Sequence, residues 1–285
     1  MKTNPEFLTL NKLRELLEKE NIDIKKYLGQ NFLIDRNARD KIVSLLNLKN
    51  KDIVVEIGPG LGELTELLVE KARKVYVFEI DKKFCSILSK RFMGFKNLHI
   101  LENDFLKSDE NFWNSLSEVK VIGNTPYYIS SPIVLHLLKF YHKIKLALLT
   151  VQKEVGERFV GKCGSKNYGI ISVLLSIYSD TKICYSLKKN LFYPMPKVDS
   201  VVIKMIPYSK PKIEIKNEKK FWDFLPLIFS YRRKKISNVV NKLFHLNKLG
   251  FEKMLREKGI PENIRVEQLP PDKIYQVFEI INSSR

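Results

Sequence analysis

Cysteine and histidine are scarce in this chain of 285 residues, and long apolar runs are missing from it. The three cysteines, Cys85, Cys163 and Cys184, stand far apart without paired spacing. This pattern argues against a disulfide scaffold or a zinc site and is typical of the reducing cytosol. The four histidines form no ligand-like pair with a cysteine, so we predict no metal. No stretch approaches the roughly 20 apolar residues that span a bilayer, and the N-terminus has no apolar signal-peptide core. We therefore expect a cytoplasmic protein without membrane contact.

Positive charge, in contrast, is abundant. The chain has 50 Lys and Arg against 32 Asp and Glu, a formal net charge of +18. Phosphate neutralisation with counterion release dominates nucleic-acid affinity, so a polyanionic partner accounts for this surplus. The alternative is a lysine-rich proteome in which all surfaces are basic, and the dense Lys and Glu usage of Lys12–Lys26 fits that alternative.

Strand-like and helix-like segments alternate through the first two thirds of the chain. The expected strands are Ile53–Ile57, Val75–Ile80, Leu98–Leu101, Val119–Ile122 and Lys145–Val151. The expected helices between them are Leu61–Lys71, Lys82–Phe92 and Pro132–Tyr141. This alternation with short connections predicts an α/β fold with a parallel, doubly wound sheet. Lys182–Leu187 and Val198–Ile206 are expected to add an antiparallel end to that sheet.

Helical patterns flank the α/β region. Leu8–Glu20 has the spacing of a surface helix, and Asp35 is the expected N-cap of a helix that ends at Leu46. Another helix is expected over Gly169–Tyr178. From Tyr208 to the C-terminus the β-branched runs cease and short helices follow, with 17 Lys and Arg against nine Asp and Glu.

A glycine-rich turn follows the first expected strand. In Glu56-Ile57-Gly58-Pro59-Gly60-Leu61-Gly62 the glycines let the backbone turn tightly and approach a ligand. In the nicotinamide fingerprint the third glycine comes three positions after the second, whereas Gly60 and Gly62 are only two apart. Glu56 suits a ligand with an amino-acid cation rather than a pyrophosphate. No Gly-Lys-Ser/Thr follows, which argues against a P-loop.

Acidic residues stand at the ends of the next two strands. Glu79 lies 17 residues beyond Gly62, where a carboxylate can accept from both hydroxyls of a ribose. Asp81 competes for this role, although its position favours capping the next helix. Asp104 can accept from the amine of an adenine, with Phe105 near the ring. Since open α/β sheets bind ligands at these strand ends, the set predicts a site for S-adenosylmethionine.

The tetrapeptide Asn124-Thr125-Pro126-Tyr127 follows the fourth expected strand. The Asn124 side-chain oxygen can accept from an exocyclic amine, Pro126 favours an extended conformation at Thr125, and Tyr127 can stack on a base. An ordinary turn is the competing interpretation, because Asn and Pro are common turn residues. A methyl donor bound at the neighbouring strand ends favours a nucleobase amine as the acceptor.

These segments resemble a known family over nearly the whole chain. The matching segments are Gly29-Gln30-Asn31-Phe32-Leu33, Glu56-Ile57-Gly58-Pro59-Gly60, Asn124-Thr125-Pro126-Tyr127, Gln152-Lys153-Glu154-Val155, Tyr168-Gly169 with Ser172-Val173, and Phe192-Tyr193-Pro194-Met195-Pro196-Lys197-Val198-Asp199-Ser200. They are similar to the adenine-N6 dimethyltransferases of ribosomal RNA, and most closely to the small-subunit family. Thr125 departs from that family, which more often has Leu or Ile there, so altered packing is expected.

The resemblance implies a class I, Rossmann-like methyltransferase domain with a small C-terminal all-helical domain. The catalytic domain would span residues 1–207, with an N-terminal helical extension over 1–26, and the basic, rRNA-binding domain would span 208–285. S-adenosylmethionine is the implied donor and S-adenosylhomocysteine the product. The implied substrate is two adjacent adenosines in the hairpin loop near the 3′ end of small-subunit rRNA, within a pre-30S particle during ribosome biogenesis. A monomer is the simplest expectation.

The resemblance carries site roles onto matching positions. Asn31 and Leu33 would contact the donor from the N-terminal segment. With the residues described above, they make up the predicted donor site: Asn31, Leu33, Glu56, Gly58, Gly60, Glu79, Asp104, Phe105 and Asn124. The predicted catalytic set is Asn124, Thr125, Pro126, Tyr127 and Phe192. The Asn124 oxygen and the Thr125 carbonyl would accept from the N6 hydrogens, with Tyr127 and Phe192 on the two faces of the base. Tyr128 is expected to pack in the core. Transfer would be a direct in-line displacement.

The basic run Arg232-Arg233-Lys234-Lys235 is expected to contact rRNA phosphates. Three alternative functions stay open: a large-subunit rRNA adenine methyltransferase of the macrolide-resistance type, a methyltransferase-fold transcription factor that binds nucleic acid without obligatory catalysis, and a DNA adenine methyltransferase. Tyr168-Gly169 and Pro196–Ser200 favour the small-subunit enzyme over the first. The intact Asn124–Tyr127 set and the missing targeting peptide count against the second.

Overall fold

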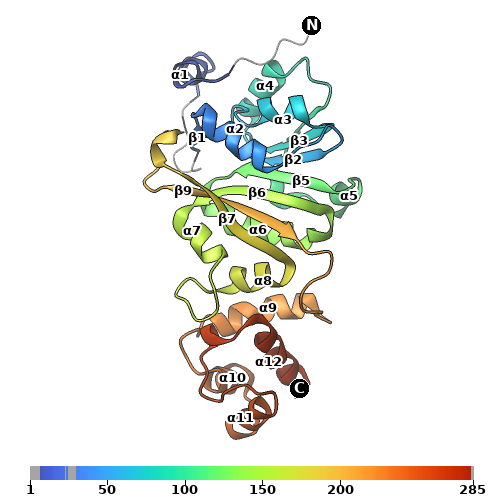
Figure 1. Ribbon diagram of the computed structural model, residues 1–285, viewed down its shortest axis with the longest axis vertical. Helices are drawn as coiled ribbons and strands as arrows, with labels where there is room; N and C mark the ends of the chain where they lie inside the picture. Colours follow the sequence, from blue (N-terminus) through green and yellow to red (C-terminus); the bar gives the residue numbers. More distant parts are fainter. Residues whose placement is uncertain (1–6, 23, 25–29, 284–285) are drawn as a thin grey trace. The chain divides into compact units, whose positions relative to one another are not determined.

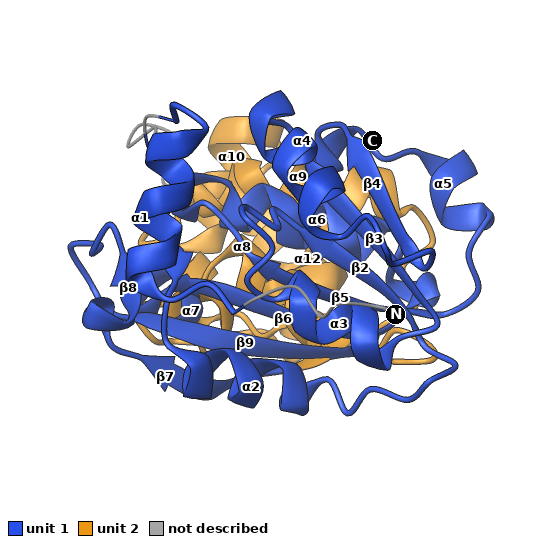
Figure 2. Ribbon diagram, turned by 90° about the horizontal axis from the view of Figure 1, so that it is seen from above, with its two compact units in different colours: residues 1–156, 181–207 blue, residues 157–180, 208–285 orange. Residues whose placement is uncertain are grey.

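The computed structural model describes residues 7–22, 24 and 30–283 (Figure 1). Residues 1–6, 23, 25 and 26 of the predicted extension, and Gly29 of the first motif, therefore lie outside the described residues. The chain forms two compact units (Figure 2). Unit 1 comprises Met1–Gly156 and Thr181–Pro207, and unit 2 comprises Glu157–Asp180 and Tyr208–Arg285. One junction falls after Pro207, and the other two enclose Glu157–Asp180, the earlier segment of unit 2.

A mixed seven-stranded sheet forms the centre of unit 1, with the strand order β4-β3-β2-β5-β6-β9-β7. The strands are β2 (Ile53–Ile57), β3 (Lys74–Glu79), β4 (Leu98–Glu102), β5 (Val119–Asn124), β6 (Ile144–Gln152), β7 (Ser179–Leu187) and β9 (Ser200–Pro207). The neighbouring pairs from β4 to β6 are parallel, whereas β9 is antiparallel to β6. The predicted parallel sheet with an antiparallel end is confirmed. A second, two-stranded sheet of β1 (Phe32–Leu33) and β8 (Phe192–Tyr193) was not predicted.

The helices of unit 1 connect these strands. They are α1 (Leu10–Lys19), α2 (Arg36–Leu45), α3 (Thr65–Lys71), α4 (Lys82–Arg91), α5 (Glu110–Asn114) and α6 (Ser130–Lys139), while α7 (Lys153–Phe159) crosses the junction to unit 2. Asp35 and Asp81 cap α2 and α4 as predicted, accepting from Ala38 N at 2.7 Å and from Lys83 N at 2.9 Å. Helix α3 begins four residues later than expected, because Gly62 has a φ of +91° and the preceding residues form turns.

Alternate residues of β3 show that the sheet is covered on both faces. Val75 and Val77 belong to a buried cluster with residues of α2 and α3. Tyr76 and Phe78 both place their rings edge-on against Phe112 of α5, with centroid separations of 5.8 and 5.0 Å. Since successive strand residues point to opposite faces, the aliphatic cluster and the aromatic cluster lie on opposite sides of the sheet. This arrangement defines a doubly wound sheet.

Helix α1 packs into a separate buried cluster beside the carboxyl end of the sheet. Its buried Leu13 and Leu17 share that cluster with residues from β1, the glycine-rich turn and α4: Leu8, Leu13, Leu17, Phe32, Leu61, Phe84 and Ile87. The buried Arg39 of α2 donates to the carbonyl oxygens of Leu33 at 2.5 Å and Leu8 at 3.0 Å. The N-terminal segment is thus bound to the body of unit 1 by apolar packing and by a charged hydrogen-bond donor.

Unit 2 is helical over most of its described length. Its helices are α8 (Ile170–Tyr178), α9 (Glu218–Phe229), α10 (Ile236–Phe244), α11 (Lys248–Glu257) and α12 (Pro271–Ser283) (Figure 1). Aromatic rings join α9 and α12, since Phe278 lies 5.4 Å from both Phe221 and Phe224 between ring centroids. Tyr168 donates from its hydroxyl to the Leu269 carbonyl at 2.9 Å. Of the helices described in either unit, none has the length and apolar character needed to cross a membrane.

Candidate active site

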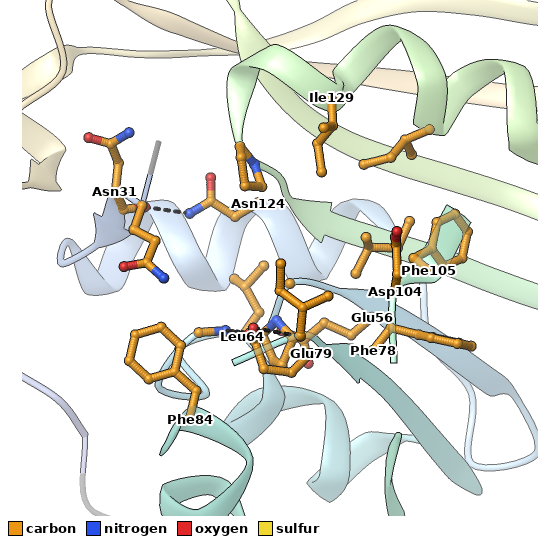
Figure 3. Close-up of a pocket in the computed structure, with 18 of the residues that line it drawn as sticks. Asn31, Glu56, Leu64, Phe78, Glu79, Phe84, Asp104, Phe105, Asn124 and Ile129 are labelled. Atoms are coloured by element: carbon orange, nitrogen blue, oxygen red, sulfur yellow. Dashed lines mark hydrogen bonds between the residues drawn. The ribbon is translucent and has the colours of Figure 1, made fainter. Parts of the chain in front are cut away.

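A cavity of about 300 Å³ lies at the carboxyl ends of the parallel strands of unit 1 (Figure 3). All nine residues predicted to bind the donor line it: Asn31, Leu33, Glu56, Gly58, Gly60, Glu79, Asp104, Phe105 and Asn124. Pro126 of the predicted catalytic set lines it as well. The structure therefore brings residues from five separate chain segments to one pocket, at the edge where open α/β sheets bind their ligands. The individual contacts assigned to these residues stay predictions.

The glycine-rich turn forms one wall of the pocket. Gly58 and Gly60 have φ values of +64° and +59°, in the left-handed region that favours glycine. The Gly58 amide donates to the Phe78 carbonyl at 3.0 Å, which joins the turn to β3. A Cβ atom on Gly60 would lie 3.2 Å from the Phe32 ring. The turn therefore requires glycine both for its conformation and for the close approach of its neighbours.

Glu79 ends β3 beside this turn. Its carboxylate accepts from the backbone amides of Ile80 and Asp81, each at 2.9 Å, and from Gly60 at 3.3 Å. These bonds hold the carboxylate in one orientation at the pocket wall. Burial raises the pKa of Glu79 to about 7, although the three backbone hydrogen bonds favour the ionised form. The free protein consequently holds Glu79 close to half ionised at neutral pH.

Glu56 lies at the end of β2 in a drier setting. Its Oε2 accepts from the Thr65 hydroxyl at 2.6 Å. Burial, reinforced by the neighbouring carboxylates of Glu63 and Glu79, raises the pKa of Glu56 to about 8. In the free protein Glu56 is therefore mostly protonated at neutral pH. A cation bound beside it would lower that pKa and favour the carboxylate.

The end of β4 contributes the side of the pocket with Asp104 and Phe105 (Figure 3). The Asp104 carboxylate accepts from the Leu106 amide at 2.9 Å, which holds it at the start of a short turn of helix. Phe105 is buried, with its ring edge-on to Phe78 at 5.4 Å between centroids. The Asn103 amide donates to the Glu79 carbonyl at 3.0 Å, so the ends of β3 and β4 are joined at the pocket.

Asn124, at the end of β5, is oriented by the N-terminal segment. Its side-chain Nδ2 donates to the Asn31 carbonyl at 2.9 Å, and Figure 3 shows the two residues together. Because this bond uses the amide NH₂ group, it fixes which end of the side chain is the acceptor. The Oδ1 atom of Asn124 is thereby left to accept from a ligand amine in the pocket.

The aromatic residues near Asn124 are arranged differently from the prediction. Tyr127 does not line the pocket, and its hydroxyl shares a 2.9 Å hydrogen bond with Ser200 of β9. Phe192 is 2% exposed within the main buried cluster of unit 1 and is likewise not part of the pocket lining. Tyr128, expected in the core, lines the pocket and is 58% exposed, so that expectation was wrong.

Thr125, the atypical member of the tetrapeptide, is buried and does not line the pocket. Its hydroxyl has no hydrogen-bond partner among the described residues. The γ-methyl group packs against the Gly123 backbone, since a Cβ on Gly123 would lie 2.9 Å from it. Thr125 therefore contributes a buried hydroxyl without a partner among the described residues, while altered packing relative to the family stays a prediction.

Sequence reasoning missed several apolar residues of the pocket. Phe32 stood inside a recognised motif, and Ile80 and Tyr128 directly followed recognised residues, so adjacency was an available signal. Phe84 had no such signal. It reaches the pocket only because α4 packs against α1 and β1, and that packing depends on tertiary structure.

The basic run of unit 2 lies in the turn between α9 and α10. Arg232 donates to the carbonyls of Lys166 and Tyr168, both at 3.3 Å, and pairs with Glu267 at 3.6 Å. These contacts give Arg232 a structural role within the unit. The side chains of Arg233, Lys234 and Lys235 are exposed. We refer to Arg233–Lys235 as the basic turn.

The polar groups of the pocket match the chemistry of S-adenosylmethionine. A constrained carboxylate suits a ribose, a strand-end aspartate beside buried rings suits an adenine, and a glycine turn next to an acidic residue suits an amino-acid moiety. Among the described residues no group of three or more His, Cys, Asp or Glu side chains is placed to hold a metal ion. The fold and the pocket define a Rossmann-like methyltransferase of class I.

Comparisons with known proteins agree on one family. The family model described as "Ribosomal RNA adenine dimethylase" matches residues 21–283. The chain belongs to this family, and it is therefore an rRNA adenine dimethyltransferase, an enzyme class that uses S-adenosylmethionine.

Named relatives cover nearly the whole chain. "Ribosomal RNA small subunit methyltransferase A" of Halothermothrix orenii is 39% identical over 90% of this chain and 87% of its own length. The protein of the same name from Clostridium acetobutylicum is 37% identical over 90% of this chain and 93% of its own. Among solved structures, a dimethyladenosine transferase from Plasmodium falciparum has a TM-score of 0.75 at 26% identity, covering 87% of this chain and 96% of that one.

Proposed function

We propose that this enzyme dimethylates N6 of two adjacent adenosines in the 3′-terminal hairpin loop of small-subunit rRNA. The observation that carries the proposal is the oriented amide of Asn124 in a pocket lined by all the predicted donor-binding residues. The names of the similar proteins from two bacteria support the small subunit as the source of the RNA. The net charge of +18 fits a polyanionic substrate.

The chemical problem is that adenine N6 is a poor nucleophile, because its lone pair is delocalised into the ring. Bound S-adenosylmethionine supplies an electrophilic methyl group. The Asn124 Oδ1, with its orientation fixed by Asn31, accepts from one N6 hydrogen. This bond favours a pyramidal nitrogen with an available lone pair. The protein therefore contributes position and orientation, without a covalent intermediate on the enzyme.

The pocket also limits which adenosines react. A base reaches Asn124 only if it is unpaired or is turned out of its helix, since the groups that would contact it lie inside a cavity. A hairpin loop offers such bases at low cost. The second methylation requires that the pocket admits a base that already carries one N6 methyl group.

The setting of the reaction follows from the substrate. We propose a pre-30S particle as the substrate, a cytoplasmic location and a monomeric enzyme. The basic turn is the proposed phosphate contact of unit 2, because its three cationic side chains are exposed whereas Arg232 is engaged within the unit.

The test is a methyl-transfer assay with radiolabelled S-adenosylmethionine on three substrates: immature small-subunit particles, large-subunit rRNA and duplex DNA. We expect label in the small-subunit rRNA alone, recovered as N6,N6-dimethyladenosine at two adjacent positions near the 3′ end. Label in large-subunit rRNA or in DNA would overturn the proposal in favour of that substrate. Tight nucleic-acid binding without label on any substrate would favour a binding protein.

A further inference from the structure

We propose that Arg39 of α2 is a positioning residue for methyl transfer, which holds β1 so that the Asn31 carbonyl orients the amide of Asn124. The inference rests on the proposed function, because it concerns the group that accepts from the adenine amine. Arg39 is not among the residues that line the cavity, so its effect on the reaction must pass through the segment that it holds.

The Arg39 side chain is fully buried, and its hydrogen bonds reach separate segments of unit 1. Nε donates to the Leu33 carbonyl of β1 at 2.5 Å, and Nη2 donates to the Leu8 carbonyl at 3.0 Å. Nη1 forms an ion pair with the Glu66 carboxylate of α3 at 3.3 Å. The guanidinium also lies over the Phe7 ring, 4.4 Å from its centroid. One side chain therefore connects α2 to α3 and to two points of the N-terminal segment.

Stability alone does not account for a charged side chain at this position. Burying an ion pair costs desolvation free energy, and apolar side chains of similar volume are often as stable or more stable in its place. An apolar side chain cannot donate to a carbonyl, whereas a guanidinium carries five N–H donors in a fixed planar geometry. What Arg39 supplies is therefore a fixed position for the backbone carbonyls that it binds.

The pairing of β1 with β8 determines which carbonyls of β1 are open to other partners. On the β8 side, the Ile34 amide donates to the Leu191 carbonyl at 2.9 Å. Backbone groups of successive residues alternate between the two edges of an antiparallel strand. The carbonyls of Asn31 and Leu33, two positions apart, therefore share the edge that faces away from β8.

Both carbonyls on this edge are hydrogen-bonded, each to a different partner. The Leu33 carbonyl accepts from Arg39, and the Asn31 carbonyl accepts from Nδ2 of Asn124 at 2.9 Å (Figure 3). A shift of β1 at Leu33 would carry the Asn31 carbonyl with it, because a single residue separates them. Arg39 is itself fixed by the first turn of α2, where its amide donates to the Asp35 carbonyl at 3.2 Å. The orientation of the Asn124 amide consequently depends on Arg39.

Glu66 joins Arg39 to a second buried arginine, and this pair provides a matched control. Glu66 Oε1 pairs with Arg39 at 3.3 Å, and Oε2 pairs with Nη2 of Arg91 at 3.4 Å. Arg91 also donates to the Leu61 carbonyl. Either arginine can be replaced while Glu66 keeps the other as its counter-ion. Arg39→Met and Arg91→Met thus remove equivalent buried cations, but Arg39→Met alone removes the donor at Leu33.

The first measurement is single-turnover methyl transfer to small-subunit particles by the full chain at saturating S-adenosylmethionine. We expect Arg39→Met to lower the rate by about 10- to 100-fold, since a displacement of roughly 1 Å at a reacting centre can cost about 10²-fold. Arg91→Met should keep the native rate. Arg39→Lys is a second variant, which retains a cation for Glu66 but loses the planar set of donors, so its rate should fall as well.

A double variant shows whether Arg39 acts through Asn124. Effects of residues that work through one contact are not additive in free energy, whereas independent effects on a rate multiply. Adding Arg39→Met to Asn124→Ala should therefore slow transfer no further than Asn124→Ala does alone. A general loss of structure in Arg39→Met would instead multiply the two reductions.

The second measurement needs no RNA and reports the Asn124 amide itself. In full-length enzyme labelled with ¹⁵N-asparagine and bound to S-adenosylhomocysteine, the Asn124 side-chain amide signal is identified by its absence from Asn124→Ala. We expect this signal to shift in Arg39→Met and Arg39→Lys and to stay at its native position in Arg91→Met. An unshifted signal in Arg39→Met would overturn the inference.

The transfer assay can overturn it independently. A native transfer rate in Arg39→Met, an equal loss in Arg91→Met, or multiplied reductions in the double variant would each contradict a positioning role. If the native enzyme methylates no small-subunit RNA, the proposed function fails instead, and the amide signal still decides whether Arg39 orients Asn124.

Discussion

Donor affinity should depend on pH through Glu79. In the free protein burial raises the pKa of this carboxyl to about 7. A ribose that donates hydrogen bonds from both hydroxyls to Glu79 requires the ionised form. A protonated carboxyl accepts fewer hydrogen bonds and needs an acceptor for its own proton. Donor binding therefore favours deprotonation and lowers the pKa of Glu79 in the complex.

The size of the effect follows from the free-state pKa. With a pKa of about 7, Glu79 is ionised in roughly one molecule in eleven at pH 6 and in roughly ten of eleven at pH 8. Through Glu79 alone, the affinity for S-adenosylhomocysteine should consequently rise about tenfold between these two pH values. At pH 7 Glu79 should release about half a proton for each ligand bound.

Isothermal titration calorimetry measures both quantities, since titrations in buffers of different ionisation enthalpy report the protons released. Glu79→Gln should bind more weakly at pH 8 and lose the tenfold rise that Glu79 contributes between pH 6 and 8. Glu56→Gln is the comparison variant: it removes the neighbouring carboxyl, whose pKa of about 8 places its own titration at the upper end of this range, and it should keep the rise that is due to Glu79. A flat affinity profile in the native enzyme, proton uptake on binding, or an unchanged profile in Glu79→Gln would refute the reasoning.

Two further predictions concern the segments outside the pocket wall. Leu13→Ala should lower the affinity for S-adenosylhomocysteine several-fold, because Leu13 packs with Phe32 and Phe84 of the pocket lining. Leu46→Ala is the control, because it removes an equally buried leucine from the main cluster: it should reduce stability by a similar ~2–5 kcal/mol without lowering the affinity for S-adenosylhomocysteine. If calorimetry gives Leu13→Ala and Leu46→Ala the same affinity, α1 does not support the donor pocket. Neutralising the basic turn, Arg233–Lys235, with glutamine should reduce the slope of log affinity against log salt for the rRNA hairpin by about 2, at ~0.7 per single-strand phosphate contact. The control neutralises three exposed lysines at the amino ends of β2 and β3, Lys49, Lys51 and Lys74, and should leave the slope unchanged. An unchanged slope in the basic-turn variant would mean that the phosphate contacts lie elsewhere.

The sequence was informative wherever a local rule determines the structure. A hydrophobic run predicted β2 with its observed bounds, and polar residues before two helices predicted the N-caps Asp35 and Asp81. Because parallel strands all end at one edge, motifs at their carboxyl ends had to meet. This is why the donor-site residues predicted at these strand ends line one cavity, whereas Asn31 and Leu33, from the N-terminal segment and β1, were assigned from the family resemblance.

The sequence was uninformative where packing between distant segments decides. Strands β1 and β8 have two residues each, too few for a periodic pattern, and they form only because they pair with each other. Which of Tyr127 and Tyr128 faces the pocket depends on a 3₁₀ turn and on the hydrogen bond to Ser200, which lies 73 residues from Tyr127. Phe192 matches the family motif, from which we expected it to cover one face of the base, but pairing of β8 with β1 buries its side chain.

The most direct test of the central claim is single-turnover methyl transfer by Asn124→Ala, measured beside its affinity for S-adenosylhomocysteine. Asn31 holds the Asn124 amide with Oδ1 free to accept from adenine N6. Loss of one preorganised hydrogen-bonding group at a reacting centre typically costs about 10²–10³ in rate. We therefore predict a fall of at least about 100-fold in the transfer rate on small-subunit particles, with donor affinity close to that of the native enzyme. An unchanged single-turnover rate would contradict the proposed role of Asn124 in methyl transfer.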